Sequence, residues 1–233
     1  MGKIARENRS RTPMHVHRTI ARLKTDHWPI VCVTLRTGNR TWVSQQEGMI
    51  AIAHLLARDY PNAALIVDGF SRLHGQSAMP PAQQEQIIHQ ELALVQAMRK
   101  ALGGGLNIQT TIGEPIVHSM VYTQIIDCYL AHHGSLQHKI GWLSNAPGLV
   151  HANSLVLSTP QLWEPALQVR PGAPKPLYLP ASMVRDSPGA TRVANNRWLD
   201  DLDNYEMDAA TVYGILKQII EQLRVSRDSS ANA

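Results

Sequence analysis

The chain has 233 residues, of which 44% are hydrophobic and 17% charged, with 15 Gly, 14 Pro and 2 Cys. This length suits one large domain or two small ones, and the composition excludes disordered, collagen-like and disulfide-rich chains. No apolar run approaches the roughly 20 residues that cross a bilayer. No apolar stretch follows the basic N-terminus, as it would in a secretory signal. We therefore expect a cytoplasmic protein without a transmembrane segment, in which Cys32 and Cys128 are buried, reduced thiols.

The net charge of +4 is concentrated at the N-terminus. Residues 1–28 hold seven basic and two acidic side chains, a net charge of +5, so the rest of the chain carries −1. A basic arm of this kind can bind nucleic acid or an anionic membrane, which would make the protein peripheral to the membrane. It can equally be a solvated lead-in. The nearly neutral body is not expected to bind nucleic acid.

Short apolar runs rich in β-branched residues recur along the chain, and turn-forming residues close each of them. These runs predict buried strands over residues 29–35, 64–67, 106–112, 128–131, 148–151 and 177–179. Segments with apolar residues at helical spacing lie between them. They predict helices from Ser44 to the break at Pro61 and over residues 83–102, 116–126, 135–142 and 208–223. Ser44 and Glu47 have the spacing of a capping box at the start of the first helix.

Strands that alternate with helices at this interval indicate right-handed βαβ units and a parallel sheet. The expected fold class is α/β, a Rossmann-like three-layer sandwich with a mainly parallel sheet of five or six strands. We expect a basic N-terminal arm over 1–28, a single Rossmann-like domain over 29–225 and a flexible tail over 226–233. Within the domain, residues 160–196 are rich in Pro, Gly and Arg and are expected to be mostly loop.

Ligands of an open parallel sheet bind beyond the carboxyl ends of the strands, near a switch in strand order. Five polar loops fall there: residues 36–40, 68–72, 113–114, 132–139 and 151–154. The helices that follow offer free N–H groups and a positive dipole end, which favour an anion such as a nucleotide diphosphate. Trp42, in the first loop, is a candidate ligand contact, whereas Trp142 is expected to pack in the core.

The segment over residues 131–142, which reads AHHGSLQHKIGW, gives the most specific signal. Gly134 allows close approach of a ligand to the backbone, and Ser135 can cap the helix or bind a phosphate. A strand, then His-Gly-small residue, then a helix resembles the donor-binding half of GT-B-fold glycosyltransferases. The family that transfers xylose or N-acetylglucosamine to protein glycans and polysaccharides is the most similar. The resemblance covers about residues 29–154.

This resemblance implies metal-independent transfer of a sugar from a nucleotide-sugar donor to a glycan or other acceptor, as in polysaccharide biosynthesis, with no further cofactor. It places the 36–40 loop near phosphate or acceptor and the 113–114 loop near the base or ribose, with residues 133–135 flanking the diphosphate. Lys139 adds positive charge there, and His133 or His132 is the candidate general base. The implied substrate-binding residues are Arg36, Thr37, Gly38, Asn39, Arg40, Gly113, Glu114, Gly134, Ser135, Lys139 and His151.

The chain departs from this family because such enzymes have two Rossmann-like halves and this chain has one. Either a second lobe or subunit supplies the other half, or the chain is a fragment, or it binds without catalysing. The alternative function is a non-catalytic interaction module of the same fold that docks a partner through its basic arm. A third candidate is a small-molecule enzyme such as a methyltransferase, but the glycine-rich first turn is missing. No His-Glu-x-x-His or Cys-x-x-Cys motif predicts a metal site.

Overall fold

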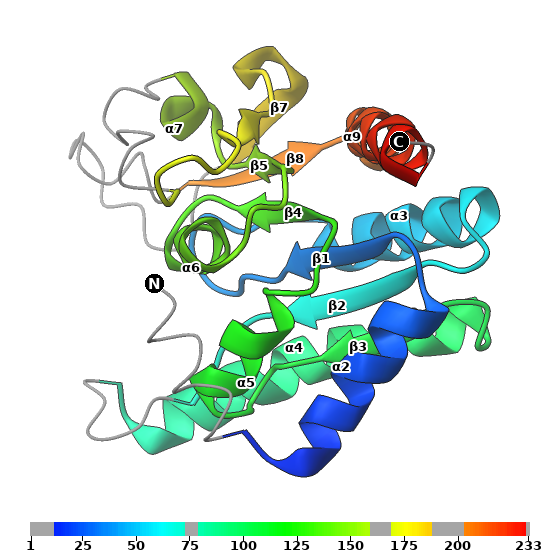
Figure 1. The fold of residues 1–233 in the computed structure, drawn as a ribbon. Helices are drawn as coiled ribbons and strands as arrows, with labels where there is room; N and C mark the ends of the chain where they lie inside the picture. The colour runs from blue at the N-terminus through cyan, green and yellow to red at the C-terminus, as the bar shows by residue number, and fades with distance from the viewer. Residues whose placement is uncertain (1–11, 73–78, 159–168, 188–202, 232–233) are drawn as a thin grey trace.

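A computed structural model describes residues 12–72, 79–158, 169–187 and 203–231 (Figure 1). At its centre lies a six-stranded parallel sheet with the strand order β3-β2-β1-β4-β5-β6. The strands are β1 (Ile30–Thr34), β2 (Ala64–Asp68), β3 (Asn107–Thr110), β4 (Cys128–His132), β5 (Gly148–His151) and β6 (Leu177–Tyr178).

Helices cover both faces of this sheet (Figure 1). One layer consists of α3 (Gln45–Asp59), α4 (Pro81–Leu102) and α9 (Ala209–Ala231). The opposite layer consists of α2 (Met14–Asp26), α5 (Ile116–Tyr122) and α6 (Ser135–Leu143). A short helix, α7 (Ser154–Ser158), follows β5. The predicted fold class, a Rossmann-like three-layer α/β sandwich, is therefore confirmed.

The apolar runs of the central strands supply both halves of the core. In β1, Val31 and Val33 pack with the α3, α4 and α9 layer, whereas Ile30 and Cys32 pack with the α2, α5 and α6 layer. Successive side chains of a strand point to opposite faces, so a strand covered on both sides must be apolar at every position. All five residues of β1 are buried, as expected for a strand that is covered on both faces.

Two strands were not predicted from the sequence. β7 (Val184–Ser187) and β8 (Asn204–Met207) form a separate antiparallel pair between β6 and α9. Their sequences, VRDS and NYEM, are short and mostly polar, so they lack the apolar signal of a buried strand. β8 matters for the site because its buried Tyr205 reaches the carboxyl edge of the main sheet.

The N-terminal segment differs from the expected solvated arm. Residues 14–26 form α2, which buries Val16 and Leu23 against the same layer as α5 and α6. α2 is therefore part of the folded domain, and only residues 12–13 of the described chain precede it. Residues 1–11 of the predicted arm lie outside the described residues.

The C-terminal part also differs from the prediction. α9 continues to Ala231, so described residues expected in the tail are helical. The segment expected to be mostly loop contains β6, where a strand was predicted, and also a 3₁₀ turn (Ala181–Met183) and β7, which were not predicted; its residues 160–168 and 188–196 lie outside the described residues. None of the described helices is long and apolar enough to span a bilayer.

Trp42 has a structural role rather than the ligand contact considered for it. The side chain is only 1% exposed, and its Nε1–H donates to Glu206 Oε2 over 3.2 Å. The indole lies directly against Gly48 of α3, where an added Cβ would stand 1.8 Å from the ring. The predicted capping box is absent, because Ser44 Oγ donates to Glu206 Oε2 at 2.6 Å instead of capping α3.

This contact predicts that Gly48→Ala will destabilise the protein. The new methyl group would overlap a buried ring that has no room to move, so we expect a loss of about 1–3 kcal/mol. Gly214→Ala is the matched control, because Gly214 is exposed on α9 and nothing lies within 4 Å of its Cβ position. That change should stabilise by about 0.5–1 kcal/mol. Urea unfolding of both variants checks this, and equal stability of the two would contradict the packing described.

Candidate functional site

The strand order places a switch point between β1 and β4. Going outward from these two neighbours, the chain runs to β2 and β3 on one side and to β5 and β6 on the other. The loops after β1 and β4 therefore diverge at the carboxyl edge of the sheet, where open α/β sheets bind ligands. Arg36 follows β1 there, and His133 and Gly134 follow β4.

Arg36 and the start of α6 face each other across this switch point. Gly134 is the N-cap residue of α6, with φ +142°, a backbone conformation that side chains rarely adopt. A Cβ at Gly134 would stand 3.8 Å from Arg36 Nη1, so the guanidinium lies beside the helix end. No side chain caps α6, and exposed Ser135 is its first residue. The first backbone N–H groups of α6 therefore point, unpaired within the described chain, toward the same place as Arg36.

The loop over residues 36–40 holds Arg36 in this position. The Gln45 side chain accepts from the Arg36 backbone N–H at 3.1 Å and donates to its carbonyl oxygen at 3.0 Å. The guanidinium Nε–H donates to the Asn39 carbonyl oxygen at 2.8 Å. At the end of the loop, Arg40 has φ +58°, a strained conformation for a non-glycine residue that is common at functional sites. The predicted residues Thr37 and Gly38 complete this loop.

Arg36 and Arg40 make the site positively charged. Burial, and then the neighbouring Arg40, lower the pKa of Arg36 to about 10, so it remains protonated at neutral pH. In the described part of the chain, neither guanidinium forms an ion pair. Arg40 Nε is buried and has no hydrogen-bond partner there. Two half-buried cations without carboxylate partners favour an anionic ligand that would neutralise them.

Three aromatic side chains gather beside these arginines. His132 ends β4 and His151 ends β5, with ring centroids 5.8 Å apart, and Tyr205 of β8 stacks on His132 at 6.2 Å. Tyr205 Oη lies 2.6 Å from His151 Nδ1. No other acceptor for that hydroxyl is found among the described residues, so we assign the proton to Tyr205 and the remaining ring proton to His151 Nε2.

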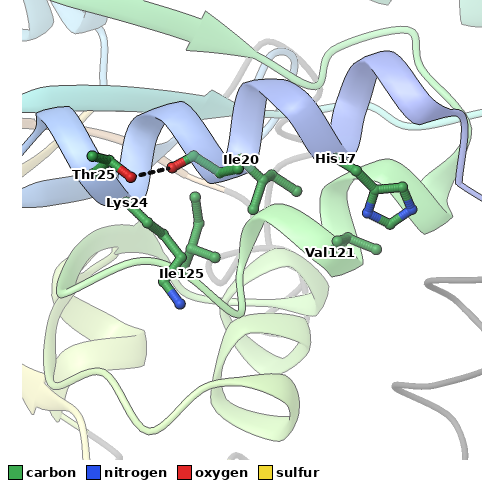
Figure 2. A pocket seen from close by; sticks show the side chains of 7 residues that line it. His17, Ile20, Lys24, Thr25, Val121 and Ile125 are labelled. Atoms are coloured by element: carbon green, nitrogen blue, oxygen red, sulfur yellow. Dashed lines mark hydrogen bonds between the residues drawn. The ribbon is translucent and has the colours of Figure 1, made fainter.

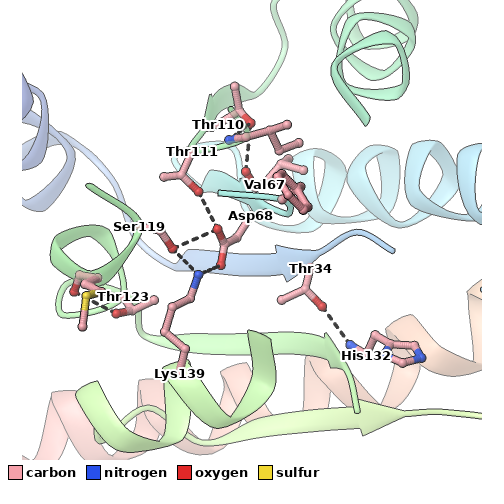
Figure 3. A network of polar contacts seen from close by, with 12 residues as sticks. Thr34, Val67, Asp68, Thr110, Thr111, Ser119, Thr123, His132 and Lys139 are labelled. Atoms are coloured by element: carbon pink, nitrogen blue, oxygen red, sulfur yellow. Dashed lines mark hydrogen bonds and ion pairs between the residues drawn. The ribbon is translucent and has the colours of Figure 1, made fainter. Parts of the chain in front are cut away.

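The two histidines leave polar atoms unpaired in the interior. His132 is 3% exposed and His151 is 1% exposed, yet the Nε2 atom of each lacks a partner within the described residues. The backbone N–H of His132 donates to Thr34 Oγ1 at 2.8 Å, which fixes the end of β4 beside β1 (Figure 3). Unsatisfied buried donors are rare in native proteins and commonly mark a site that a ligand or water completes.

Burial keeps these imidazoles neutral at pH 7. Burial is the main cause of a lowered pKa in all three: the pKa of His132 lies well below its usual range, that of His151 is about 3, and that of His133 is about 4. The candidate general base His133 is therefore a weak base, because general-base catalysis is most efficient when the pKa lies near the working pH. Neutral imidazoles instead suit hydrogen bonds to a polar ligand.

Lys139 was expected to face the anion site, but its side chain is engaged elsewhere. Its Nζ lies 2.6 Å from Asp68 Oδ2 and also contacts Ser119 Oγ, while Asp68 Oδ1 accepts hydrogen bonds from Thr111 and Ser119 (Figure 3). Asp68 is 1% exposed and Lys139 is 8% exposed. This buried network joins the carboxyl end of β2 to α5 and α6. The charge of Lys139 is therefore used inside the protein, and we do not include it in the ligand site.

Glu91 is a buried acid that the sequence analysis missed. It lies on the inner face of α4, is 3% exposed and accepts the Phe70 backbone N–H at 2.7 Å, just beyond β2. Burial is the largest cause that raises the pKa of Glu91, to about 7; Asp68 acts in the same direction, whereas the Phe70 N–H and Arg36 lower it. The sequence contains an indication of this burial, because Glu91 lies in the same row along the helix as Ile88 and Val95, where an apolar residue is expected.

The predicted residues after β3 lie apart from this cluster. Gly113 and Glu114 also sit at the carboxyl edge, but β3 and β4 are separated by β2 and β1. At about 4.8 Å per strand, that separation is about 14 Å. Glu114 is half-exposed, lies 3.2 Å from His118 Nδ1, and its carbonyl oxygen accepts the Arg72 backbone N–H. The site therefore unites the predicted residues of the β1, β4 and β5 loops, without those of the β3 loop.

Two other expectations concern metals and Trp142. Within the described ranges, no cluster of three or more His, Cys, Asp or Glu side chains has a metal-binding arrangement. Trp142, expected in the core, is 45% exposed on α6.

No protein-family model matches the chain, and no curated protein is significantly similar to it in sequence.

Proposed function

We propose that the protein binds the diphosphate of a nucleotide sugar at the switch point between β1 and β4, for metal-independent transfer of the sugar to a glycan or other acceptor. The observation that carries this proposal is the position of the Arg36 guanidinium beside Gly134 at the uncapped start of α6. The resemblance of residues 131–142 to the donor-binding half of GT-B glycosyltransferases points to the same ligand class.

The chemistry of the cluster suits a diphosphate leaving group. Breaking the bond between sugar and diphosphate places negative charge on the diphosphate, and guanidinium groups and helix N-termini can stabilise that charge. Arg36, Arg40 and the first N–H groups of α6 supply such donors, and His151 Nε2 adds a neutral one. The loop with Glu114 follows β3, about 14 Å across the sheet from β4, so we propose that it contacts the nucleoside part of the ligand.

The acceptor side of the reaction is proposed to lie outside this chain. The described residues form one Rossmann-like lobe, and His133, the candidate base from the sequence, has a pKa of about 4. We propose that a second lobe or subunit in the cytoplasm presents the acceptor and its base. A chain that acts alone would bind nucleotide sugars without transferring them, as in the alternative of a non-catalytic module.

Calorimetry with nucleoside diphosphates tests the proposal. We expect Arg36→Ala to weaken binding of the best-bound nucleoside diphosphate by about tenfold or more, since a charge-assisted hydrogen bond contributes about 1.5–3 kcal/mol. Arg185→Ala is the matched control, because Arg185 is exposed on β7. It should leave the affinity unchanged.

The same measurement can reject the proposal. If no nucleoside diphosphate or inorganic pyrophosphate binds, or if both variants bind as the parent does, Arg36 and α6 do not form a diphosphate site. A rise in melting temperature with ligand concentration gives an independent readout, because a ligand that binds only the folded state stabilises it.

A further inference from the structure

A groove runs between α2 and α5, on the layer opposite to α3, α4 and α9 (Figure 2). It encloses about 530 Å³. Ile20 of α2, Val121 of α5 and Ile125, just beyond α5, form its apolar floor. Val121 and Ile125 are buried, whereas Ile20 is half-buried. The groove therefore has an apolar floor and polar side chains at its border, and it is separate from the cluster at the carboxyl edge.

Basic side chains border this groove. His17 and Lys24 line it directly, and Figure 2 shows the Lys24 side chain extending over the floor beside Ile125. Arg18 and Arg22, one helical turn apart, lie exposed on α2. In the described part of the chain, neither these arginines nor Lys24 form an ion pair. The only acidic residue of α2 is Asp26, at its end.

The exposed side of α2 also presents an apolar group. Met14 is 68% exposed at the start of the helix, and Arg18 Nη2 lies 3.4 Å from its sulfur atom. Basic residues next to exposed apolar ones are the features of helices that lie in the interface of an anionic membrane. Nucleic acid is favoured less, because no Trp, Tyr or Phe lines the groove for base stacking.

We propose that the α2–α5 face docks on the surface of an anionic phospholipid membrane. Lys24, Arg18 and Arg22 would contact lipid phosphates, and the groove floor would receive the first carbons of an acyl chain. α2 leads into the amino end of β1, so it runs opposite to the strands, and His15 near its start lies 6.5 Å from His118 of α5. The start of α2 therefore lies toward the carboxyl edge of the sheet, whereas Lys24 and Ile125 come shortly before β1 and β4 and lie toward its amino edge.

Vesicle co-sedimentation of the full chain tests this proposal. We expect binding to vesicles of equimolar phosphatidylcholine and phosphatidylglycerol, no binding to phosphatidylcholine alone, and weaker binding as salt increases. Each basic residue near such a surface contributes about a fivefold gain in affinity. Lys24→Glu, which also adds a repulsion, should therefore lower the partition coefficient by about fivefold or more.

Lys100→Glu is the matched control, because Lys100 is exposed at the end of α4 on the opposite layer and the change in net charge is the same. It should lower binding far less than Lys24→Glu. Ala21→Asp probes the groove itself: Ala21 is exposed and lines it, so the fold should persist, as circular dichroism can verify, while binding falls.

Three results would overturn the proposal. The first is equal loss of vesicle binding in Lys24→Glu and Lys100→Glu. The second is equal binding to neutral and anionic vesicles. The third is binding of a duplex oligonucleotide that depends on Lys24 without any binding to vesicles. None of these measurements involves nucleoside diphosphates, so their outcome is independent of the proposed ligand site.

Discussion

Replacing Lys139 with Met should reduce the free energy of unfolding by about 3–5 kcal/mol. The ammonium group lies 2.6 Å from Asp68 Oδ2, and both side chains are buried. Removal of one partner of a buried ion pair leaves the other charge without compensation, which is far more costly than loss of an exposed pair. Urea denaturation at pH 7 measures the change.

Lys217→Met is the matched control for this prediction. Lys217 Nζ lies 2.7 Å from Asp59 Oδ2, but the lysine side chain is 44% exposed, so its loss should cost at most about 1 kcal/mol. The double variant Asp68→Asn with Lys139→Met should recover part of the loss, because no buried charge remains unpaired. Equal losses in Lys139→Met and Lys217→Met would show that the Asp68 network does not stabilise the fold as described.

Replacing Glu91 with Gln should produce a stability gain that depends on pH. In the unfolded chain the carboxyl has a pKa near 4.5, whereas in the folded protein burial raises it to about 7. The folded state therefore holds the proton more tightly, and the stability contributed by Glu91 is fully present below pH 4.5 and falls as pH rises to about 7. The lost contribution amounts to about 3 kcal/mol at pH 8.

Gln is uncharged at every pH and keeps an oxygen that can accept the Phe70 N–H, so Glu91→Gln removes this loss. We expect the variant to match the parent at pH 4.5 and to exceed it by about 3 kcal/mol at pH 8. His151 acts in the opposite sense, since its lowered pKa reduces stability as pH falls below 6.5, but this effect is common to both proteins and cancels in the difference. A difference that stays constant with pH would contradict the assignment.

The secondary structure of the central sheet could be predicted from short segments of the sequence. β5 has the bounds expected for it, residues 148–151, β4 is one residue longer at its end, and β1 is one residue shorter at each end. Strands buried on both faces require continuous apolar runs, which are visible locally. β7 and β8 were missed because their stability comes from pairing with each other and from contacts such as that of Tyr205 with His151.

The candidate site could be predicted only in part. The rule that ligands bind at carboxyl ends of parallel strands correctly brought Arg36, Gly134 and His151 to one edge. It could not order the strands, so it grouped Glu114 with them, although two strands intervene between β3 and β4. The sequence also gave no means to exclude Lys139, whose charge is paired by a residue far away in the chain.

The sequence by itself determined the α/β fold class, through segments with strand and helix patterns that alternate along the chain, and a positive charge concentrated in the first 28 residues. Only the tertiary structure decided that part of this basic segment is a packed helix, that Trp42 is core and Trp142 exposed, and that Glu91 is buried near ionisable groups. The physical reason is the range of the interactions involved. Burial on both faces of a strand leaves a local apolar pattern, whereas ion pairing, ring packing and pKa depend on neighbours that the fold brings from distant segments.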